Sequence, residues 1–309
     1  MVGASDAVAI AAGEAHACAL LASGKVRCWG SHAYGQLGTG NAADSVPHFK
    51  SLEVNGVSGA VGITAGRLHT CAVLADGSAK CLGYNANSQI GDGTTLQRTA
   101  PVAVVELTGL VDIASAYSTT CALKQTGLVK CWGSNGSGQA GNGNASAVTP
   151  MNVAGLTQAT ALASGPNAQH ACALVSGGAV RCWGTNSNGQ LGDNSTIARN
   201  LPISVSGISA ATAISAGTSH TCATLGDGTG RCWGYNYYGQ LGDNTTTQRL
   251  MPTPVTGLSG AVGVGAQWLA TCFAMTGGGV KCAGYNTTGG LGDGSTTHKT
   301  AVVSTGGLP

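Results

Sequence analysis

Short runs of alternating apolar and polar residues, separated by glycine-rich turns, cover almost the whole chain. Near the N-terminus such runs occupy residues 8–11, 16–20, 26–29 and 49–54. Runs of this length with a period of two, bounded by Gly, Asn and Asp, are typical of antiparallel β-strands. The pattern therefore predicts an all-β protein.

The same group of four predicted strands recurs along the chain. The first cysteines of successive copies are 53, 50, 51, 50 and 50 residues apart. We place the six copies at approximately residues 1–56, 57–109, 110–155, 156–207, 208–257 and 258–309. Units that bury little alone must stack or close into a ring to share a core. We therefore expect a single domain over residues 1–309, although length alone would suggest two.

Each copy holds two cysteines with nine residues between them, and the six pairs use all 12. A turn centred on Ser23 places Cys18 directly opposite Cys28, at a distance that a disulfide bridges. The same register predicts six disulfides: Cys18–Cys28, Cys71–Cys81, Cys121–Cys131, Cys172–Cys182, Cys222–Cys232 and Cys272–Cys282. Zinc is the alternative, but the chain has no C-x₂-C motif. Disulfides indicate an oxidising compartment, so we expect a secreted or cell-surface protein.

The copies share a motif that is found in one known family. The fifth copy has it most completely, as AGTSHTC at residues 216–222 and CWGYNYYGQLGD at residues 232–243. This motif resembles the regulator of chromosome condensation repeat, here of the bacterial secreted, disulfide-containing type. The resemblance implies a β-propeller of four-stranded antiparallel blades around a central channel. The known family is typically seven-bladed, so six copies leave two possibilities: a closed six-bladed ring, which we favour, or a ring that lacks a blade.

The resemblance also suggests functions. The founding member of the family exchanges nucleotide on a small nuclear GTPase, another member senses ultraviolet-B light, and a bacterial secreted member inhibits β-lactamases. Predicted disulfides disfavour a nuclear or cytosolic role, because they are rare in those compartments. The photoreceptor's Gly-Trp-Arg-His-Thr motif is not present in this sequence.

Composition and charge narrow the function further. Gly accounts for 51 of 309 residues, charged residues make up 8%, and the net charge is +2. This charge gives no reason to expect binding to nucleic acid or to a membrane surface. No apolar run approaches the roughly 18 residues of a membrane span, so we expect no membrane insertion. The N-terminus carries no export signal, and we expect that signal to have been removed.

Catalytic and metal-binding groups are sparse. The chain has no clustered carboxylate pair, no G-x-S-x-G motif and no phosphate-binding loop, so we expect neither an enzyme nor a cofactor. Four copies place a histidine two residues before the first cysteine: His16, His69, His170 and His220. We expect hydrogen-bonded core residues there rather than metal ligands, because Thr119 and Ala270 replace them in the other copies.

Charged residues recur at two further positions. An aspartate lies six residues before a basic residue in four copies: Asp92/Arg98, Asp193/Arg199, Asp243/Arg249 and Asp293/Lys299. We interpret these pairs as local loop staples, since calcium prefers several carboxylates. A basic residue also precedes every second cysteine: Arg27, Lys80, Lys130, Arg181, Arg231 and Lys281. In a closed ring these six would form a circle of positive charge for an anionic ligand. We favour the alternative, in which their stems pack on the neighbouring blade and their charges reach water or carbonyls.

Aromatic residues fall into two sets. Trp29, Trp132, Trp183 and Trp233 follow the second cysteine and are expected to pack between blades. The other set does not follow the repeat: Tyr34, Tyr84, Tyr117, Tyr235, Tyr237, Tyr238, Trp268 and Tyr285. Because the repeat does not require them, we single out Tyr235, Tyr237, Tyr238 and Trp268 as candidate binding residues.

The sequence thus predicts an extracellular, monomeric module that binds an unidentified protein or glycan through the loop face of a rigid propeller. A structural spacer of a larger cell-surface protein and a secreted enzyme inhibitor are the alternatives. Sequons at Asn144, Asn194, Asn244 and Asn286 fall in or beside loops expected to be exposed.

Overall fold

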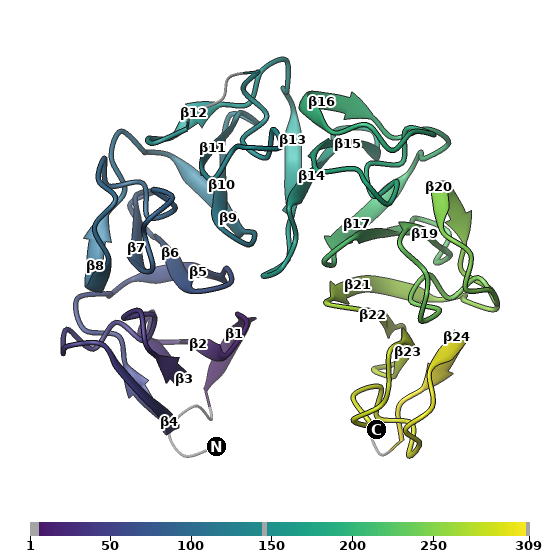
Figure 1. The fold of residues 1–309 in the computed structure, drawn as a ribbon, viewed down its shortest axis with the longest axis horizontal. Coiled ribbons are helices and arrows are strands. Elements are labelled where there is room, and N and C mark those ends of the chain that lie inside the picture. Colours follow the sequence, from purple (N-terminus) through teal and green to yellow (C-terminus); the bar gives the residue numbers. More distant parts are fainter. Residues whose placement is uncertain (1–5, 144–146, 307–309) are drawn as a thin grey trace. The chain divides into compact units, whose positions relative to one another are not determined.

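A computed structural model describes residues 6–143 and 147–306 (Figure 1). Every regular element in these ranges is a β-strand. The strands form six sheets of four antiparallel strands each, so the predicted fold class is confirmed. We call the sheets blades 1 to 6 in chain order.

Two compact units divide the chain, Met1–Thr157 and Gln158–Pro309. The N-terminal unit contains blade 1, β1 (Ala7–Ala12), β2 (His16–Leu21), β3 (Val26–His32) and β4 (Asp44–Glu53); blade 2, β5 (Ala60–Ala65), β6 (His69–Leu74), β7 (Ala79–Gly83) and β8 (Arg98–Ala103); and blade 3, β9 (Leu110–Ser115), β10 (Thr119–Lys124), β11 (Val129–Gly133) and β12 (Met151–Asn152).

The C-terminal unit contains blade 4, β13 (Ala159–Ala163), β14 (His170–Val175), β15 (Ala179–Gly184) and β16 (Arg199–Ser204); blade 5, β17 (Ala211–Ala216), β18 (His220–Leu225), β19 (Gly230–Gly234) and β20 (Arg249–Pro254); and blade 6, β21 (Ala261–Gln267), β22 (Ala270–Met275), β23 (Val280–Gly284) and β24 (Lys299–Ser304). The two units meet in sequence close to the predicted border between the third and fourth copies. Organisation as a single domain and closure as a ring stay predictions.

The first blade differs from its predicted strands in one respect. Its fourth strand, β4, starts at Asp44 rather than at residue 49, and β3 continues to His32. The ladder is interrupted on either side of Gly30, whose φ is +104°, and pairing then resumes between His32 and Asp44. The sequence predicted that Gly30 begins a loop, whereas in the structure Gly30 lies within β3 at an irregularity of the ladder.

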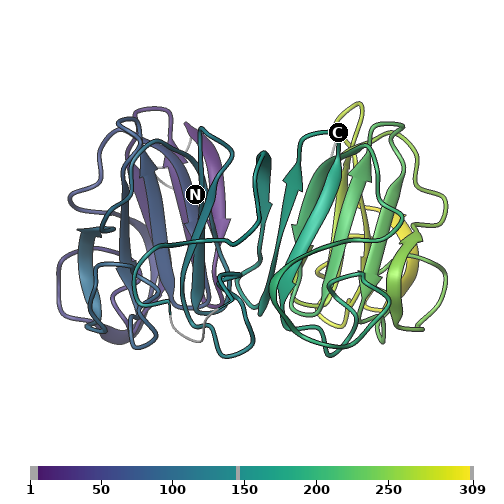
Figure 2. The same cartoon turned by 90° about the horizontal axis from the view of Figure 1, so that it is seen from above.

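The strand order gives each blade two different ends. Within each unit the first strands of neighbouring blades contact one another, and the fourth strand forms the other edge of each sheet. Antiparallel order places the turn between the first and second strands at the same end as the long loop between the third and fourth strands. We call this the long-loop end. Figure 2 shows the sheets from the side, with connections at both of their ends.

Prolines mark the outer edge of the blades. Pro47, Pro101, Pro202 and Pro252 all lie in fourth strands, in β4, β8, β16 and β20. Proline cannot donate a hydrogen bond to a ladder and is therefore tolerated on edge strands.

Each blade contains one disulfide between its second and third strands. The two cysteines are direct partners in the ladder, with Cα atoms 4.0–4.1 Å apart in every pair. The six predicted bridges, Cys18–Cys28 through Cys272–Cys282, are confirmed, and no cysteine is free.

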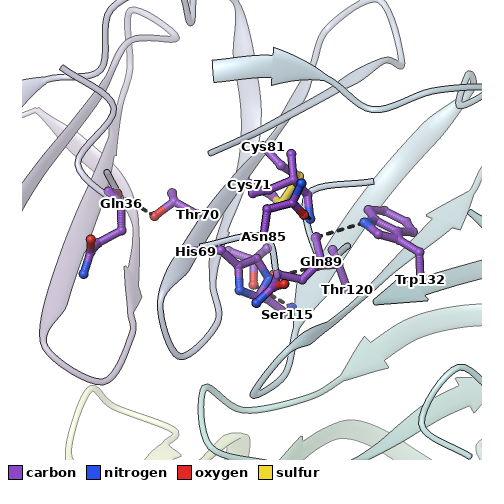
Figure 3. The surroundings of a disulfide bond; sticks show 12 residues. Gln36, His69, Thr70, Cys71, Cys81, Asn85, Gln89, Ser115, Thr120 and Trp132 are labelled. Carbon is purple, nitrogen blue, oxygen red and sulfur yellow. Dashed lines mark hydrogen bonds between the residues drawn. A yellow bond between two sulfur atoms is a disulfide. The ribbon is translucent and has the colours of Figure 1, made fainter. Parts of the chain in front are cut away.

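The hydrophobic core lies between successive blades of each unit. Separate clusters join blades 1 and 2, 2 and 3, 4 and 5, and 5 and 6. Trp132 and Trp233 are fully buried in two of them, and their indole N–H groups donate to the carbonyls of Gln89 and Gln190 in the preceding blade, at 3.0 and 2.9 Å (Figure 3 shows Trp132). Inter-blade packing of these tryptophans is thus as predicted, whereas Trp29 in blade 1 is only partly buried.

The repeated histidines link neighbouring blades. The Nε2 atom of each lies 2.8–2.9 Å from the hydroxyl of the threonine that precedes the first cysteine of the next blade, in the pairs His16–Thr70, His69–Thr120, His170–Thr221 and His220–Thr271. In three of these pairs the threonine hydroxyl donates to the main-chain carbonyl of Gln36, Gln89 or Gln190. Because the hydroxyl has a single hydrogen, it must accept from a protonated Nε2. This arrangement fixes the neutral tautomer of the histidine.

Glycine makes room for three of these histidines, whereas Asn167 stands three residues before His170. A Cβ atom on Gly13, Gly66 or Gly217 would overlap the imidazole of the histidine three residues later. The copy with Thr119 has Ala116 at that position, and the copy with Ala270 has Gln267. The Ala-Gly-x-x-His motif is therefore a packing unit in which a missing side chain accommodates a buried ring.

Candidate binding surface

The aromatic residues that depart from the repeat gather at the long-loop ends. Tyr235, Tyr237 and Tyr238 follow β19, Trp268 lies in the turn between β21 and β22, and Tyr285 follows β23. All five belong to blades 5 and 6 in the C-terminal unit. Together with His298, just before β24, we call them the aromatic patch.

The rings of the aromatic patch form a continuous series of contacts. Tyr238 meets Tyr237 at 5.0 Å and Tyr285 at 5.2 Å between ring centroids, both edge-on. Trp268 meets Tyr285 at 5.4 Å, and the ring of His298 stacks on Tyr285 at 5.0 Å. Such spacings are those of favourable aromatic pairs. The structure thus brings all four predicted binding residues into one cluster, together with Tyr285 and His298.

The two ends of the patch face solvent. Tyr237 is 67% exposed and Trp268 is 55% exposed, while Tyr235, Tyr238 and Tyr285 are partly buried beneath them. Trp268 adopts a φ of +22°, a left-handed value that bulky residues rarely take. Exposed large rings supported by other rings are typical of contact surfaces.

Buried polar side chains fix the loops that carry the patch. The side-chain amide of Asn236 donates to Asp243 Oδ1 and to the carbonyls of Thr245 and Thr247, at 3.0–3.1 Å. Its Oδ1 accepts from the main-chain N–H of Leu241 at 3.0 Å. In blade 6, Asn286 makes the same set of bonds. The tyrosines therefore sit on loops that need little further ordering to bind a partner.

The aspartates six residues before a basic residue close these same loops. Asp243 Oδ2 accepts from Arg249 Nε at 2.7 Å, and Asp293 pairs with Lys299 at 3.1 Å. Burial raises the pKa of Asp243, but hydrogen bonds from Thr245, Arg249 and Asn236 outweigh it and hold that pKa below its usual value. The loop-staple interpretation agrees with this geometry, and both Asp243 and Asp293 are already engaged.

The basic residues that precede the second cysteine of each copy lie on third strands, away from the edge where first strands meet. Arg27 donates to the hydroxyl and the carbonyl of Ser51 at 3.0 and 2.7 Å. Lys80 donates to the carbonyl of Gly56, and Lys130 to that of Pro150. Arg27, Lys80 and Lys130 thus donate to main-chain carbonyls, as the interpretation that we favoured expects. Whether Arg27, Lys80, Lys130, Arg181, Arg231 and Lys281 form a circle stays a prediction.

The N-terminal unit carries aromatic residues at its long-loop end as well. Tyr34 and Tyr84 meet edge-on at 5.1 Å. The guanidinium of Arg67 lies over the ring of Tyr117, 4.5 Å from the centroid, and donates to the Tyr117 hydroxyl. Tyr34 is 37% exposed and Tyr84 and Tyr117 are partly buried, so these rings present less surface than Tyr237 and Trp268 do.

The sequons differ in what the fold allows. Asn194 and Asn244 are exposed, with φ near +61° and +69°. Asn286 is itself buried with its amide engaged, whereas Thr287 and Thr288 of the same sequon are exposed. Asn144 lies outside the described residues.

Sequence reasoning missed His298. The other copies with a basic residue at the start of the fourth strand have Gln97, Ala198 and Gln248 at the preceding position. A departure from the repeat, the criterion that selected the tyrosines, would also have selected this histidine.

Catalytic or metal-binding clusters are not found among the described residues. No group of three His, Cys, Asp or Glu side chains in those ranges is placed to hold a metal ion. A cavity of about 360 Å³ between the loops of blades 2 and 3 is lined by small and polar residues, including Ser88, Asn135 and Val148, with no acid or base. This cavity offers no general acid–base pair.

Comparison with known proteins shows the family. The profile of the RCC1-like domain matches residues 1–306. The chain belongs to the RCC1-like domain family. The predicted family membership is thereby confirmed, and the bacterial secreted subtype stays a prediction. RCC1-like propellers are typically binding or exchange-factor proteins.

Individual relatives cover the chain in different ways. The ultraviolet-B receptor UVR8 of Arabidopsis thaliana is 34% identical over 95 residues, which are 31% of this chain and 21% of the length of UVR8. Human WBSCR16 superposes with a TM-score of 0.85 over 96% of this chain and 81% of its own, at 18% identity. Yeast RCC1 (Prp20), solved with Kap60 bound, gives a TM-score of 0.84 over 97% and 75%, at 19% identity. The solved structures show the fold alone.

Two observations bear on the compartment. Six disulfides indicate an oxidising environment such as the extracellular space. In residues 6–143 and 147–306 there is no helix that could cross a bilayer.

Proposed function

We propose that this chain is an extracellular protein-binding module that contacts its partner through the aromatic patch on blades 5 and 6. The observation that carries the proposal is the continuous contact of Tyr235, Tyr237, Tyr238, Tyr285 and Trp268, with both ends of the series exposed. Tyrosine and tryptophan dominate the energetically important positions of protein interfaces.

The surroundings of the patch favour a protein over a glycan. Sugar recognition requires directional hydrogen bonds to hydroxyls in addition to an aromatic platform. In the loops that carry the tyrosines, the amides of Asn236 and Asn286 and the carboxylates of Asp243 and Asp293 are used inside the loops themselves. The exposed rings of Tyr237 and Trp268 suit apolar and cationic side chains.

Family and compartment support the same proposal. Yeast RCC1, which shares this fold, has been solved with another protein bound. The disulfides favour action outside the cell. A structural spacer would be expected to present a uniformly polar face, whereas this end presents exposed rings. We also propose that the chain acts as a monomer and binds neither nucleic acid nor a membrane.

Affinity capture tests the proposal. The immobilised protein is exposed to the extracellular fraction of its source, alongside Tyr237→Ala, Trp268→Ala and, as a matched control, Phe49→Ala. Phe49 is 91% exposed but lies on the edge strand β4. We expect the first two variants to lose a specific partner by about tenfold or more, and the control to retain it. Equal capture by all three variants would exclude the aromatic patch as the contact surface.

A further inference from the structure

The turns between first and second strands carry different chemistry in the two units. In the N-terminal unit, one residue from each blade takes part in a chain of contacts: Glu14, Arg67 and Tyr117. Arg67 Nε donates to Glu14 Oε2 at 2.7 Å, and the same guanidinium lies over the ring of Tyr117. An aromatic face in this position is therefore covered by a cation from the preceding blade.

The C-terminal unit carries another side chain at the corresponding position of the repeat. Gly66-Arg67-Leu68-His69 corresponds to Gly217-Thr218-Ser219-His220 in the repeat register. The main-chain N–H of Arg67 donates to the carbonyl of Tyr117 at 3.3 Å, and that of Thr218 donates to the carbonyl of Trp268 at 3.3 Å. Trp268 thus aligns with Tyr117 and Thr218 with Arg67, although β21 continues to Gln267, which pairs with Ala270, and Trp268 has a φ of +22°.

The substitution leaves an aromatic face without its cation. Among the described residues, no guanidinium lies over Trp268, and its side chain is 55% exposed. Residues 164–169 of blade 4, in the turn that corresponds to the one carrying Glu14, contain no acid. Tryptophan attracts cations more strongly than tyrosine does. Tyr285 packs on the indole at an interplanar angle of 65° and holds it in place.

We propose that Trp268 receives the guanidinium of an arginine from the partner protein, in the kind of contact that Arg67 makes with Tyr117. The inference rests on the proposed function and names the chemistry of its central contact. Arginine suits the site better than lysine because a planar guanidinium stacks on a ring and is more weakly hydrated. Because Asp243 and Asp293 are paired with Arg249 and Lys299, the attraction comes from the ring, and added salt should weaken it only slightly.

Nuclear magnetic resonance with a defined probe tests this contact. N-acetyl-arginine amide is titrated into the protein while the indole N–H signal of Trp268, assigned from Trp268→Phe, and the backbone amide of Thr218 are followed. N-acetyl-citrulline amide, which has nearly the same shape without the charge, is the matched ligand control. We expect a saturable shift at Trp268 with arginine and about fivefold weaker binding of citrulline.

Two variants sharpen the result. Thr218→Arg should place the chain's own guanidinium over Trp268 and remove the response to the probe. Arg67→Thr should leave the Trp268 response unchanged and create a second response at Tyr117. If Thr218→Arg does not fold, Trp268→Leu replaces it, and the Thr218 amide should then no longer distinguish arginine from citrulline.

The failure of this inference differs from the failure of the proposed function. Equal binding of arginine and citrulline, or an undiminished response in folded Thr218→Arg, would overturn the inference. If Trp268→Ala nevertheless abolishes partner capture, the aromatic patch remains the contact surface without an arginine contact. If capture is unaffected by Trp268→Ala, the proposed function fails first.

Discussion

His69 Nε2 lies 2.9 Å from the hydroxyl of Thr120 in the next blade, and that hydroxyl donates to the carbonyl of Gln89 at 2.9 Å. The imidazole therefore carries a proton on Nε2, in a completely buried position (Figure 3). Its Nδ1 has no hydrogen-bond partner among the described residues. Burial lowers the pKa of His69 to about 3, and a second effect, repulsion from His16, acts in the same direction.

Acid should destabilise the protein well above the range in which aspartates titrate. Burial lowers the pKa of His16 and His220 to about 4 and that of His170 to about 3. The unfolded chain, with histidine pKa near 6.5, binds protons first, so stability is constant above that pH and falls below it. At pH 5 each of the four histidines costs on the order of 2 kcal/mol.

Urea unfolding at pH 7.5 and pH 5 measures this loss. A variant with His220→Thr should show a smaller difference between the two pH values than the natural chain. An equal stability at both pH values would show that these imidazoles are not buried in the neutral form.

Thr120→Val removes one hydroxyl from an inter-blade link and keeps the branched shape of the side chain. The N–H of His69 and the carbonyl of Gln89 would both lose this hydroxyl as a partner in the core. We expect a loss of about 1–3 kcal/mol in the free energy of unfolding. Thr95→Val, at an exposed loop position, should change it by less than about 0.5 kcal/mol in the same urea titration.

Gly217→Ala should be destabilising for a reason that lies in His220. The added methyl group would overlap the imidazole, so we expect a loss of about 2 kcal/mol or more. Combining it with His220→Thr removes the obstruction, as the third copy does with Ala116 and Thr119. The losses of unfolding free energy in the two single variants should therefore sum to at least about 1 kcal/mol more than the loss in the double variant. Simple additivity in a double-mutant cycle would contradict this packing relationship.

Removal of one disulfide tests how much each bridge stabilises its blade. The Cys222–Cys232 bridge closes a ring with a sequence separation of 10 residues. In the chain-entropy model such a short ring contributes about 2.5–3 kcal/mol. Chemical denaturation of Cys222→Ala/Cys232→Ala should show a loss of this order. A loss below about 0.5 kcal/mol would indicate that the fold depends on its inter-blade core alone.

The periodic part of the fold could be predicted from the sequence because repetition averages out local ambiguity. The alternation of apolar and polar residues predicted the second and third strands. The position of the turn between them predicted that Cys18 pairs with Cys28. The start of β4 was missed because Gly30 interrupts a ladder that later resumes. The role of Gly217 could not be predicted, because it depends on how the ring of His220 packs. The role of Gln190 could not be predicted either, because its carbonyl accepts from Trp233 in the next blade.

The candidate surface was only partly predictable. Tyr235, Tyr237, Tyr238 and Trp268 stood out because the repeat does not need them. Their contact with Tyr285 and His298 depends on how the loops of blades 5 and 6 fold back, which alternation does not encode. The burial of Asn286 itself was not predictable, because it depends on the hydrogen bonds that its amide makes within its own loop.

Hydrogen exchange on the chain alone and in complex with its captured partner tests the central claim most directly. We predict slower exchange in residues 235–245, 266–270 and 285–298, which carry the aromatic patch, and unchanged exchange at the opposite end of the same blades, in residues 226–229 and 276–279. Protection confined to the opposite end, or to the edge strands β20 and β24, would show that the partner binds elsewhere.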